Sequence, residues 1–215
     1  MRLLCAFDLD HTLVRSTLDL AAMKAEIRRL AGRRGIALPP VSLSWTIAQT
    51  IDAMAAAEPA VEAACWAIAL EHEMAALDSA TCEPGARETV EALAAAEVPL
   101  AIWTNNARRA TEIALARCGL RSFFRTLITR DEAALKPDPA GLALLREAHP
   151  ARPVCVVGDS WVDGVAAQAG GAAFIAYRIG PEELRRRALS PRVVIHDLRA
   201  LPEHLAALAG TRWPV

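Results

Sequence analysis

Two carboxylates two residues apart follow a short apolar run near the start of the chain. The run Leu3–Phe7 leads directly into Asp8 and, two residues later, Asp10. A run of this kind predicts a buried strand. Side chains at i and i+2 of an extended chain point the same way, so both acids should face one spot past the strand's carboxyl end. Neighbouring carboxylates repel and need a cation, a shared proton, or both. The spacing therefore predicts a metal-dependent reaction centre.

Three further groups of polar residues follow later predicted strands, in the order Thr104 and Asn105, then Lys136, then Asp159 and Asp163. Loops at the carboxyl ends of parallel strands converge on one crevice. Carboxylate oxygens suit a hard cation such as Mg²⁺, and a lysine with hydroxyl and N–H donors suits a phosphoryl group. Taken singly, these residues also fit ordinary roles as turn formers, helix caps or a solvated charge. Their joint occurrence in this order favours a site.

The elements that must position these residues alternate between strand and helix from about residue 83 onward. Strands are expected at 98–103, 126–129, 153–157, 172–177 and 193–195, and helices at 84–97, 106–118, 138–149, 161–169 and 202–209. Strands alternating with helices imply a parallel sheet covered on both faces. The expected fold class is α/β, with a Rossmann-like parallel sheet.

Residues 15–80 break this alternation, with helices expected at 19–34, 45–57 and 59–77. The segment is too long for an ordinary strand-to-helix loop. We expect a catalytic core domain at 1–14 and 81–215 and an inserted helical cap domain at 15–80. The insertion follows the first strand, which favours a lid that limits water and shapes the substrate pocket. The alternative is a helical bundle that only adds stability.

In its motifs the chain resembles hydrolases of the haloacid dehalogenase superfamily. The resemblance rests on the run FDLDHTL at 7–13, then Thr104-Asn105, then Leu135-Lys136-Pro137, then Gly158-Asp159-Ser160 with Asp163. The pattern is most similar to the phosphoglycolate-phosphatase-like group, whose helical cap lies between the first and second motifs. The resemblance implies a Mg²⁺-dependent phosphatase that acts on a small phosphorylated metabolite.

The same resemblance implies a role for each matching residue. Asp8 would be the nucleophile that forms an aspartyl-phosphate, and Asp10 would be the general acid and then the base. Thr12 would orient Asp10. Lys136 would offset the negative charge and hold Asp8 ionised. The implied Mg²⁺ ligands are Asp8, Asp10 through its backbone carbonyl, Asp159, and Asp163 directly or through water. The implied phosphate-binding groups are Thr12, Thr104, the N–H of Asn105, and Lys136.

Two positions depart from the family pattern. His11 stands where many members carry glycine, and we interpret it as a tolerated loop residue. Arg15 stands where many carry aspartate. It would meet either a substrate anion or an acid of the cap.

Other functions fit part of the pattern. A phosphomutase of the same superfamily would return the phosphate to another hydroxyl of its substrate. A phospho-accepting signalling module fits less well, because Thr104 stands where such a module needs an acid. A phosphate-binding scaffold without catalysis is disfavoured because every catalytic position is filled. The helices at 15–80 show no motif that names a substrate.

Composition limits the kinds of partner and compartment that we expect for this protein. The chain has 24 basic and 25 acidic residues and a formal net charge of -1, which gives no general attraction to nucleic acid or to an anionic membrane. Its five cysteines are scattered and are expected to be reduced. The apolar start is interrupted by Asp8 and Asp10, so we expect no signal peptide, and no apolar run approaches the roughly 20 residues that span a bilayer. We expect a cytoplasmic protein.

Overall fold

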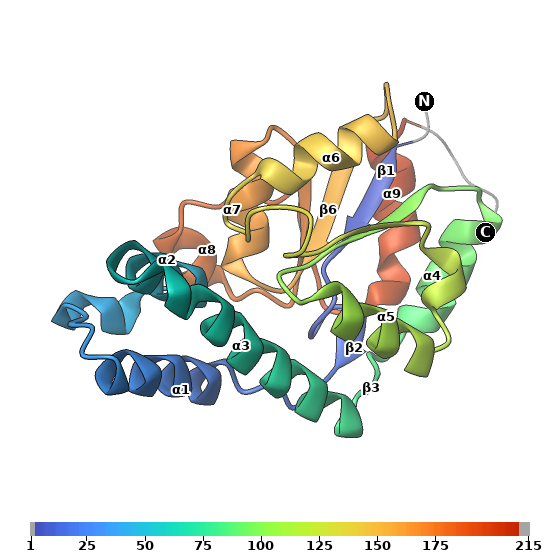
Figure 1. Ribbon diagram of the computed structural model, residues 1–215. Helices are drawn as coiled ribbons and strands as arrows, with labels where there is room; N and C mark the ends of the chain where they lie inside the picture. Colours follow the sequence, from blue (N-terminus) through green and yellow to red (C-terminus); the bar gives the residue numbers. More distant parts are fainter. Residues whose placement is uncertain (1–2, 211–215) are drawn as a thin grey trace. The chain divides into compact units, whose positions relative to one another are not determined.

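A parallel sheet runs through the part of the chain that the computed structural model describes, residues 3–210. Its strands are β1 (Leu4–Phe7), β4 (Leu100–Trp103), β5 (Thr126–Ile128), β6 (Val154–Gly158), β7 (Ala173–Tyr177) and β8 (Val193–Ile195). Their order across the sheet is β5-β4-β1-β6-β7-β8 (Figure 1). The first strand therefore lies between β4 and β6, with Cys5 opposite both Leu100 and Cys155. The predicted α/β class with a Rossmann-like parallel sheet is confirmed.

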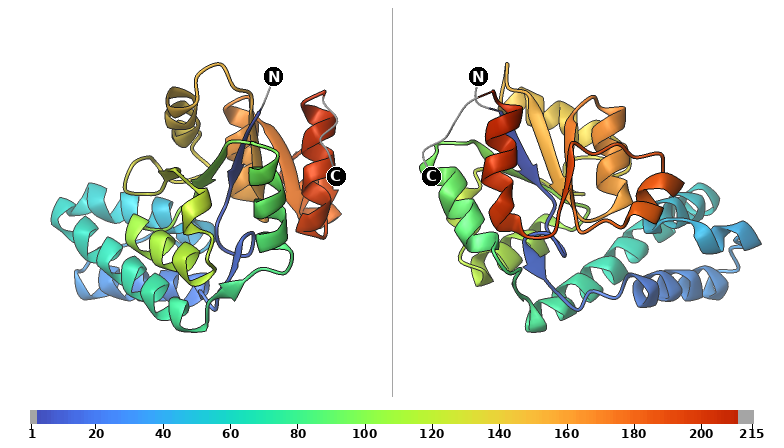
Figure 2. Two further views of the ribbon diagram at one scale, coloured as in Figure 1. Left: turned by 90° about the vertical axis from the view of Figure 1, so that its right-hand side faces the viewer. Right: turned by 180° about the vertical axis from the view of Figure 1, so that it is seen from behind.

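Helices cover both faces of this sheet, as Figure 2 shows. They are α4 (Ala86–Ala95), α5 (Arg108–Arg117), α6 (Ala140–Ala148), α7 (Trp161–Ala169), α8 (Pro181–Arg186) and α9 (Leu201–Leu208), with short 3-10 turns at Arg121–Phe123 and Leu198–Ala200. Helices α6 and α7 lie on one face, where Leu145 and Ala166 pack with Val156 and other buried strand residues. Helices α4 and α9 lie on the other face. Coverage on both faces explains why the central strands read as continuous apolar runs.

A two-stranded ribbon also belongs to this unit. Strands β2 (Val14–Arg15) and β3 (Thr81–Cys82) pair antiparallel. By its internal contacts the chain divides into one unit of Met1–Ser16 with Ala80–Val215 and a second of Thr17–Ser79. The ribbon keeps residues 14–16 and 80–83 with the sheet, so the divisions fall slightly inside the predicted cap of 15–80. Residues 1–2 and 211–215 of the predicted core lie outside the described range.

The second unit is helical. It contains α1 (Leu20–Arg33), α2 (Ile47–Ala57) and α3 (Glu62–Ala76), with 3-10 turns at Pro40–Ser44, Pro59–Val61 and Leu77–Ser79. The Asp19 side chain accepts from the first N–H groups of α1, and Thr46 with Gln49 forms a capping box on α2. Met23, Met54 and other buried apolar residues form its core. That this unit acts as a lid stays a prediction.

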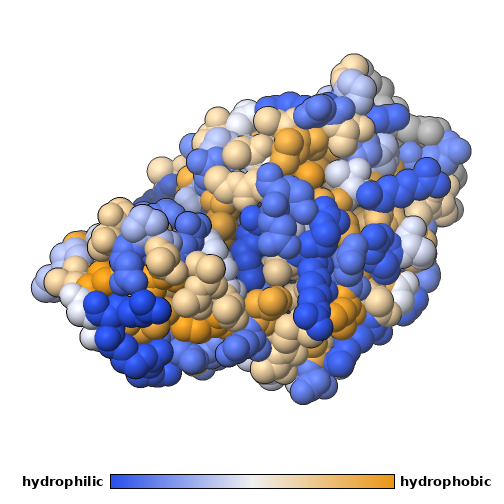
Figure 3. All heavy atoms as spheres, viewed as in Figure 1, coloured by the Kyte–Doolittle hydropathy of each residue, from blue (hydrophilic) through white to orange (hydrophobic). Residues whose placement is uncertain are grey.

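Figure 3 shows hydrophilic and hydrophobic residues interspersed on one face of the molecule. None of the helices within residues 3–210 has the length and apolar character needed to cross a membrane. All five cysteines are free, as expected, and four of them are buried.

Candidate active site

Asp8 is the first residue after β1. Its backbone N–H continues the sheet pattern by donating to the carbonyl of Val157, 2.9 Å away. Its side chain is 13% exposed and accepts a hydrogen bond from Lys136 Nζ at 2.8 Å. The chain then turns sharply, with the N–H groups of Leu13 and Val14 both bonded to the carbonyl of Leu9. Asp8 therefore lies at the carboxyl end of the central strand β1, as predicted.

Lys136 lies at the centre of the buried polar groups. Its side chain is 1% exposed, and Nζ donates to Asp8 Oδ1, to Asp163 Oδ1 at 2.5 Å and to the carbonyl oxygen of Trp103 at 2.7 Å. Burial alone would lower its pKa, but the charges of Asp163 and Asp8 outweigh burial and raise the pKa above its usual value. The contacts with Asp163 and Asp8 thus favour the charged form of the ammonium beside Asp8.

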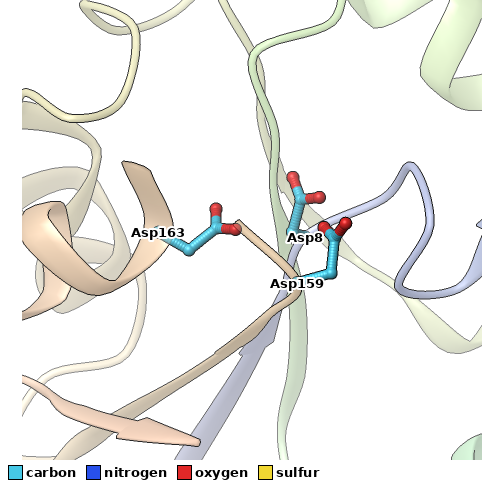
Figure 4. Close-up of side chains that lie close together, drawn as sticks. All are labelled: Asp8, Asp159 and Asp163. Atoms are coloured by element: carbon cyan, nitrogen blue, oxygen red, sulfur yellow. The ribbon is translucent and has the colours of Figure 1, made fainter. Parts of the chain in front are cut away.

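Three carboxylates surround one point. Asp8, Asp159 and Asp163 each offer an oxygen, and these oxygens lie within 4.8 Å of one another. Figure 4 shows the three side chains coming from the end of β1, the loop after β6 and the start of α7. Three acids facing a single lysine leave an excess of negative charge. An all-oxygen set of this kind suits a hard divalent cation such as Mg²⁺.

The pKa values of these acids report the same excess charge. Burial, followed by the charges of Asp8 and Asp163, raises the pKa of Asp159 to about 8. Burial also raises the pKa of Asp163 to about 6, although its contact with Lys136 acts in the opposite direction. Without a cation the cluster favours holding protons, which is the electrostatic condition that a bound metal ion would relieve.

Asp163 owes its position to the start of α7. Ser160 caps this helix, and its backbone N–H donates to Asp163 Oδ2 at 3.0 Å in a capping box. A Cβ at Gly158 would lie 2.4 Å from the same oxygen. Only glycine at the end of β6 leaves room for the Asp163 carboxylate, so the Gly158 of the motif has a steric reason.

Asp10 faces different partners. Ser16 Oγ donates to its Oδ1 at 2.8 Å, and Asn106 Nδ2 donates to its Oδ2. Burial, together with the nearby charge of Asp8, raises the pKa of Asp10 despite these two hydrogen bonds. Its carboxylate is not one of the three clustered side chains, and its backbone carbonyl as a metal ligand stays a prediction. The sequence placed Asn106 beside Thr104 and Asn105 but gave it no role, and it did not point to Ser16.

Thr12 is fully buried but makes a different contact from the one expected. Its hydroxyl donates to Asp159 Oδ1 at 3.3 Å, whereas Asp10 is held by Ser16 and Asn106. The Thr12 hydroxyl thus links the first and last motifs, and its expected role in orienting Asp10 stays a prediction.

Thr104 and Asn105 follow β4, beside the lysine. Thr104 is 3% exposed, and its Oγ1 accepts from the N–H of Asn106 at 3.2 Å. The Asn105 side chain pairs with the backbone of Lys136 through both its amide nitrogen and its amide oxygen. Only the N–H of Asn105 was singled out from the sequence, and the contact of its side chain was not foreseen.

Arg15 pairs with an acid outside the predicted cap, and its contact with a substrate anion stays a prediction. Its guanidinium bonds both oxygens of Glu83, each at 3.2 Å, and Glu83 belongs to the same unit, just after β3. Glu83 is 3% exposed and also accepts from Tyr177 Oη at 3.0 Å and Arg178 Nη1 at 2.7 Å. Burial would raise the pKa of Glu83, but the bonds from Arg15 and Tyr177 lower it overall. The Arg15–Glu83 pair thus anchors the ribbon.

His11 occupies the left-handed region, with φ of 56°. This conformation favours glycine, which explains the glycine that many members carry at this position. His11 is exposed, consistent with its interpretation as a tolerated loop residue.

Comparisons with known proteins identify the family of this chain. A family model described as haloacid dehalogenase-like hydrolase matches residues 3–171. The chain belongs to this family. A relative named phosphoglycolate phosphatase from Pseudomonas syringae pv. syringae is 35% identical over 216 residues, covering 92% of this chain and 78% of the relative. A Pseudomonas fluorescens relative of the same name is 33% identical with the same coverage.

Solved structures share the fold of this chain. A hydrolase from Pseudomonas syringae has a TM-score of 0.69 at 20% identity and covers 97% of this chain and 99% of its own. The L-2-haloacid dehalogenase from Xanthobacter autotrophicus has a TM-score of 0.60 at 18% identity, covering 97% of this chain and 100% of its own. The predicted membership of the haloacid dehalogenase family is therefore confirmed, and the protein is a hydrolase.

Proposed function

We propose that this hydrolase cleaves a small phosphate monoester through a phosphoryl group carried transiently on Asp8. The observation that carries the proposal is the contact of Asp8 with the buried ammonium of Lys136, beside the cluster completed by Asp159 and Asp163. Phosphoryl transfer requires mainly positioning and stabilisation of charge on the transferred group. A fixed lysine next to an oxygen-rich cation site fits that requirement.

In the first step, a carboxylate oxygen of Asp8 attacks phosphorus while the bond to the leaving oxygen breaks. Asp10 donates a proton to that oxygen, so the alcohol departs neutral. In the second step Asp10 takes a proton from water, the water oxygen attacks phosphorus, and inorganic phosphate leaves as Asp8 is regenerated. The raised pKa of Asp10 fits a group that must first carry a proton. Its hydrogen bonds from Ser16 and Asn106 favour the carboxylate that serves as base in the second step.

The remaining residues would bind and neutralise the phosphoryl group. Thr104 and the N–H of Asn105 would donate to its oxygens, and Lys136 would hold Asp8 ionised. Asp8, Asp159 and Asp163 would hold a Mg²⁺ ion, which supplies charge neutralisation when bound. The helical unit Thr17–Ser79 would restrict access and select the substrate.

Asp10 favours a phosphatase over a dehalogenase. A halide leaves without a proton, so a dehalogenase needs no acid at this position. The likeness to the Xanthobacter dehalogenase concerns the fold, whereas the relatives at 33–35% identity are named phosphoglycolate phosphatase. A small phosphorylated acid such as 2-phosphoglycolate is accordingly the first substrate to test.

The test measures phosphate release from p-nitrophenyl phosphate and from 2-phosphoglycolate, with Mg²⁺ and with EDTA. We expect turnover that requires the cation and disappears in Asp8→Asn, a near-isosteric change that removes the nucleophile. Circular dichroism of the variant controls for folding. Turnover in Asp8→Asn equal to that of the wild type would refute the assignment.

A further inference from the structure

The end of β4 and the loop after it form hydrogen bonds with Lys136 at two places, its ammonium and its backbone. The ammonium donates to the carbonyl of Trp103, the last residue of β4, at 2.7 Å. The Asn105 side chain meets the backbone of Lys136 with two bonds: Asn105 Nδ2 donates to the Lys136 carbonyl at 2.9 Å, and the Lys136 N–H donates to Asn105 Oδ1 at 2.8 Å. Both ends of the lysine are therefore attached to one short stretch of chain.

This pairing needs the side chain of asparagine. A planar amide carries an NH₂ donor group beside a carbonyl acceptor, and these match the carbonyl and the N–H of one residue. An aspartate of the same shape would accept from the N–H but would set an oxygen against the Lys136 carbonyl. Alanine would make neither bond. The chain has only two asparagines, and the second, Asn106, turns to Asp10 instead.

We infer that Asn105 is a positioning residue, whose side chain holds the backbone of Lys136 so that its ammonium reaches Asp8 and Asp163. The inference rests on the proposed function, because the placement of the ammonium matters only if Asp8 is the nucleophile. It assigns the Asn105 side chain a task separate from that of its own N–H. Small displacements of a catalytic group reduce rates strongly, by about 100-fold for about 1 Å.

Asn105→Ala keeps the backbone N–H and removes both bonds to Lys136. We expect kcat for p-nitrophenyl phosphate to fall by about 10- to 100-fold, while KM changes by less than about 3-fold. Asn105→Asp should also lower kcat. An unchanged kcat in Asn105→Ala would overturn the inference, and a loss expressed in KM alone would overturn it as well.

A double-mutant cycle tests whether Asn105 acts through Lys136. If it does, adding Asn105→Ala to Lys136→Met should cause almost no further loss of kcat, because the ammonium that Asn105 positions is already gone. If the two losses multiply, Asn105 acts by another route and the inference is wrong. Wild-type protein without any phosphatase activity would instead refute the proposed function.

Hydrogen exchange of the Lys136 amide provides a readout that does not depend on turnover. In the wild type this N–H donates to Asn105, so its exchange should be slow. Asn105→Ala should speed it, whereas Asn106→Ala, the neighbouring control directed at Asp10, should leave it unchanged. Equal protection in the wild type and Asn105→Ala would overturn the inference.

Discussion

Replacing Lys136 with methionine tests the buried charge balance of the site. The change keeps most of the chain length and removes a group that donates to Asp8, Asp163 and the Trp103 carbonyl. Lys136 and Asp163 are each 1% exposed, so the variant leaves a carboxylate buried without its cation. Removing one partner of a buried ion pair lowers the free energy of unfolding by about 3–5 kcal/mol. Asp8, at 13% exposure, lies nearer to solvent and should add less.

Urea unfolding near neutral pH, in EDTA, measures this loss. The matched control is Lys24→Met, which removes the chain's other lysine from α1, where Nζ donates to the carbonyl of Trp45. Lys24 is only half-buried, so water can replace its contacts, and the control should lose clearly less stability than Lys136→Met.

The reasoning fails if the two lysine variants lose similar stability, or if Lys136→Met loses less than about 1 kcal/mol. Either result would mean that Asp8 and Asp163 do not depend on the ammonium.

Four further outcomes follow from the same contacts. Because the folded-state pKa values of about 8 for Asp159 and about 6 for Asp163 exceed the unfolded value of about 3.9, metal-free protein should lose stability as pH rises from about 4 to 8. Thermal melts should show this slope in EDTA and a flatter one with Mg²⁺. Gly158→Ala, whose new Cβ would collide with Asp163, should lower the free energy of unfolding by about 1–3 kcal/mol and also reduce kcat. Glu83→Gln should destabilise by about 1–2 kcal/mol in urea titrations, since its arginine partners are half exposed and can rehydrate. His11→Gly should leave stability unchanged or raise it by up to about 1 kcal/mol, because it relieves a left-handed backbone; a loss of stability would contradict this reading.

The sheet and its polar edge were predictable because each strand carries its own signal. Apolar runs such as 100–103 and 154–157 are buried on both faces, and Gly119 and Gly171 stand just beyond the helices that they were expected to end. The rule that ligands bind beyond the carboxyl ends of parallel strands then brings Asp8, Lys136 and Asp163 together. Their observed contacts follow that rule.

The features that the sequence did not predict depend on contacts between distant residues, and such contacts leave no local pattern in the sequence. The ribbon of β2 and β3 has two residues in each strand, too few to show an alternation. Glu83 looks like any loop acid until Arg15 and Tyr177 are placed around it. The contacts of Ser16 and Asn106 with Asp10 depend on the exact turn of two loops, which residue types alone do not determine.

The central claim is that Asp8 carries the phosphoryl group. With p-nitrophenyl phosphate, whose leaving group departs without a proton, the first step does not depend on Asp10. Asp10→Asn should then slow mainly the second step, because no base remains to activate water, so the intermediate should accumulate. The decisive measurement mixes this variant with a substrate radiolabelled on phosphorus, quenches with acid and maps the label by peptide mass spectrometry. We predict one phosphoryl group on the peptide that contains Asp8, and none in Asp8→Asn/Asp10→Asn. Label on another residue, or product formed by the wild type with no labelled protein at any time, would contradict the account.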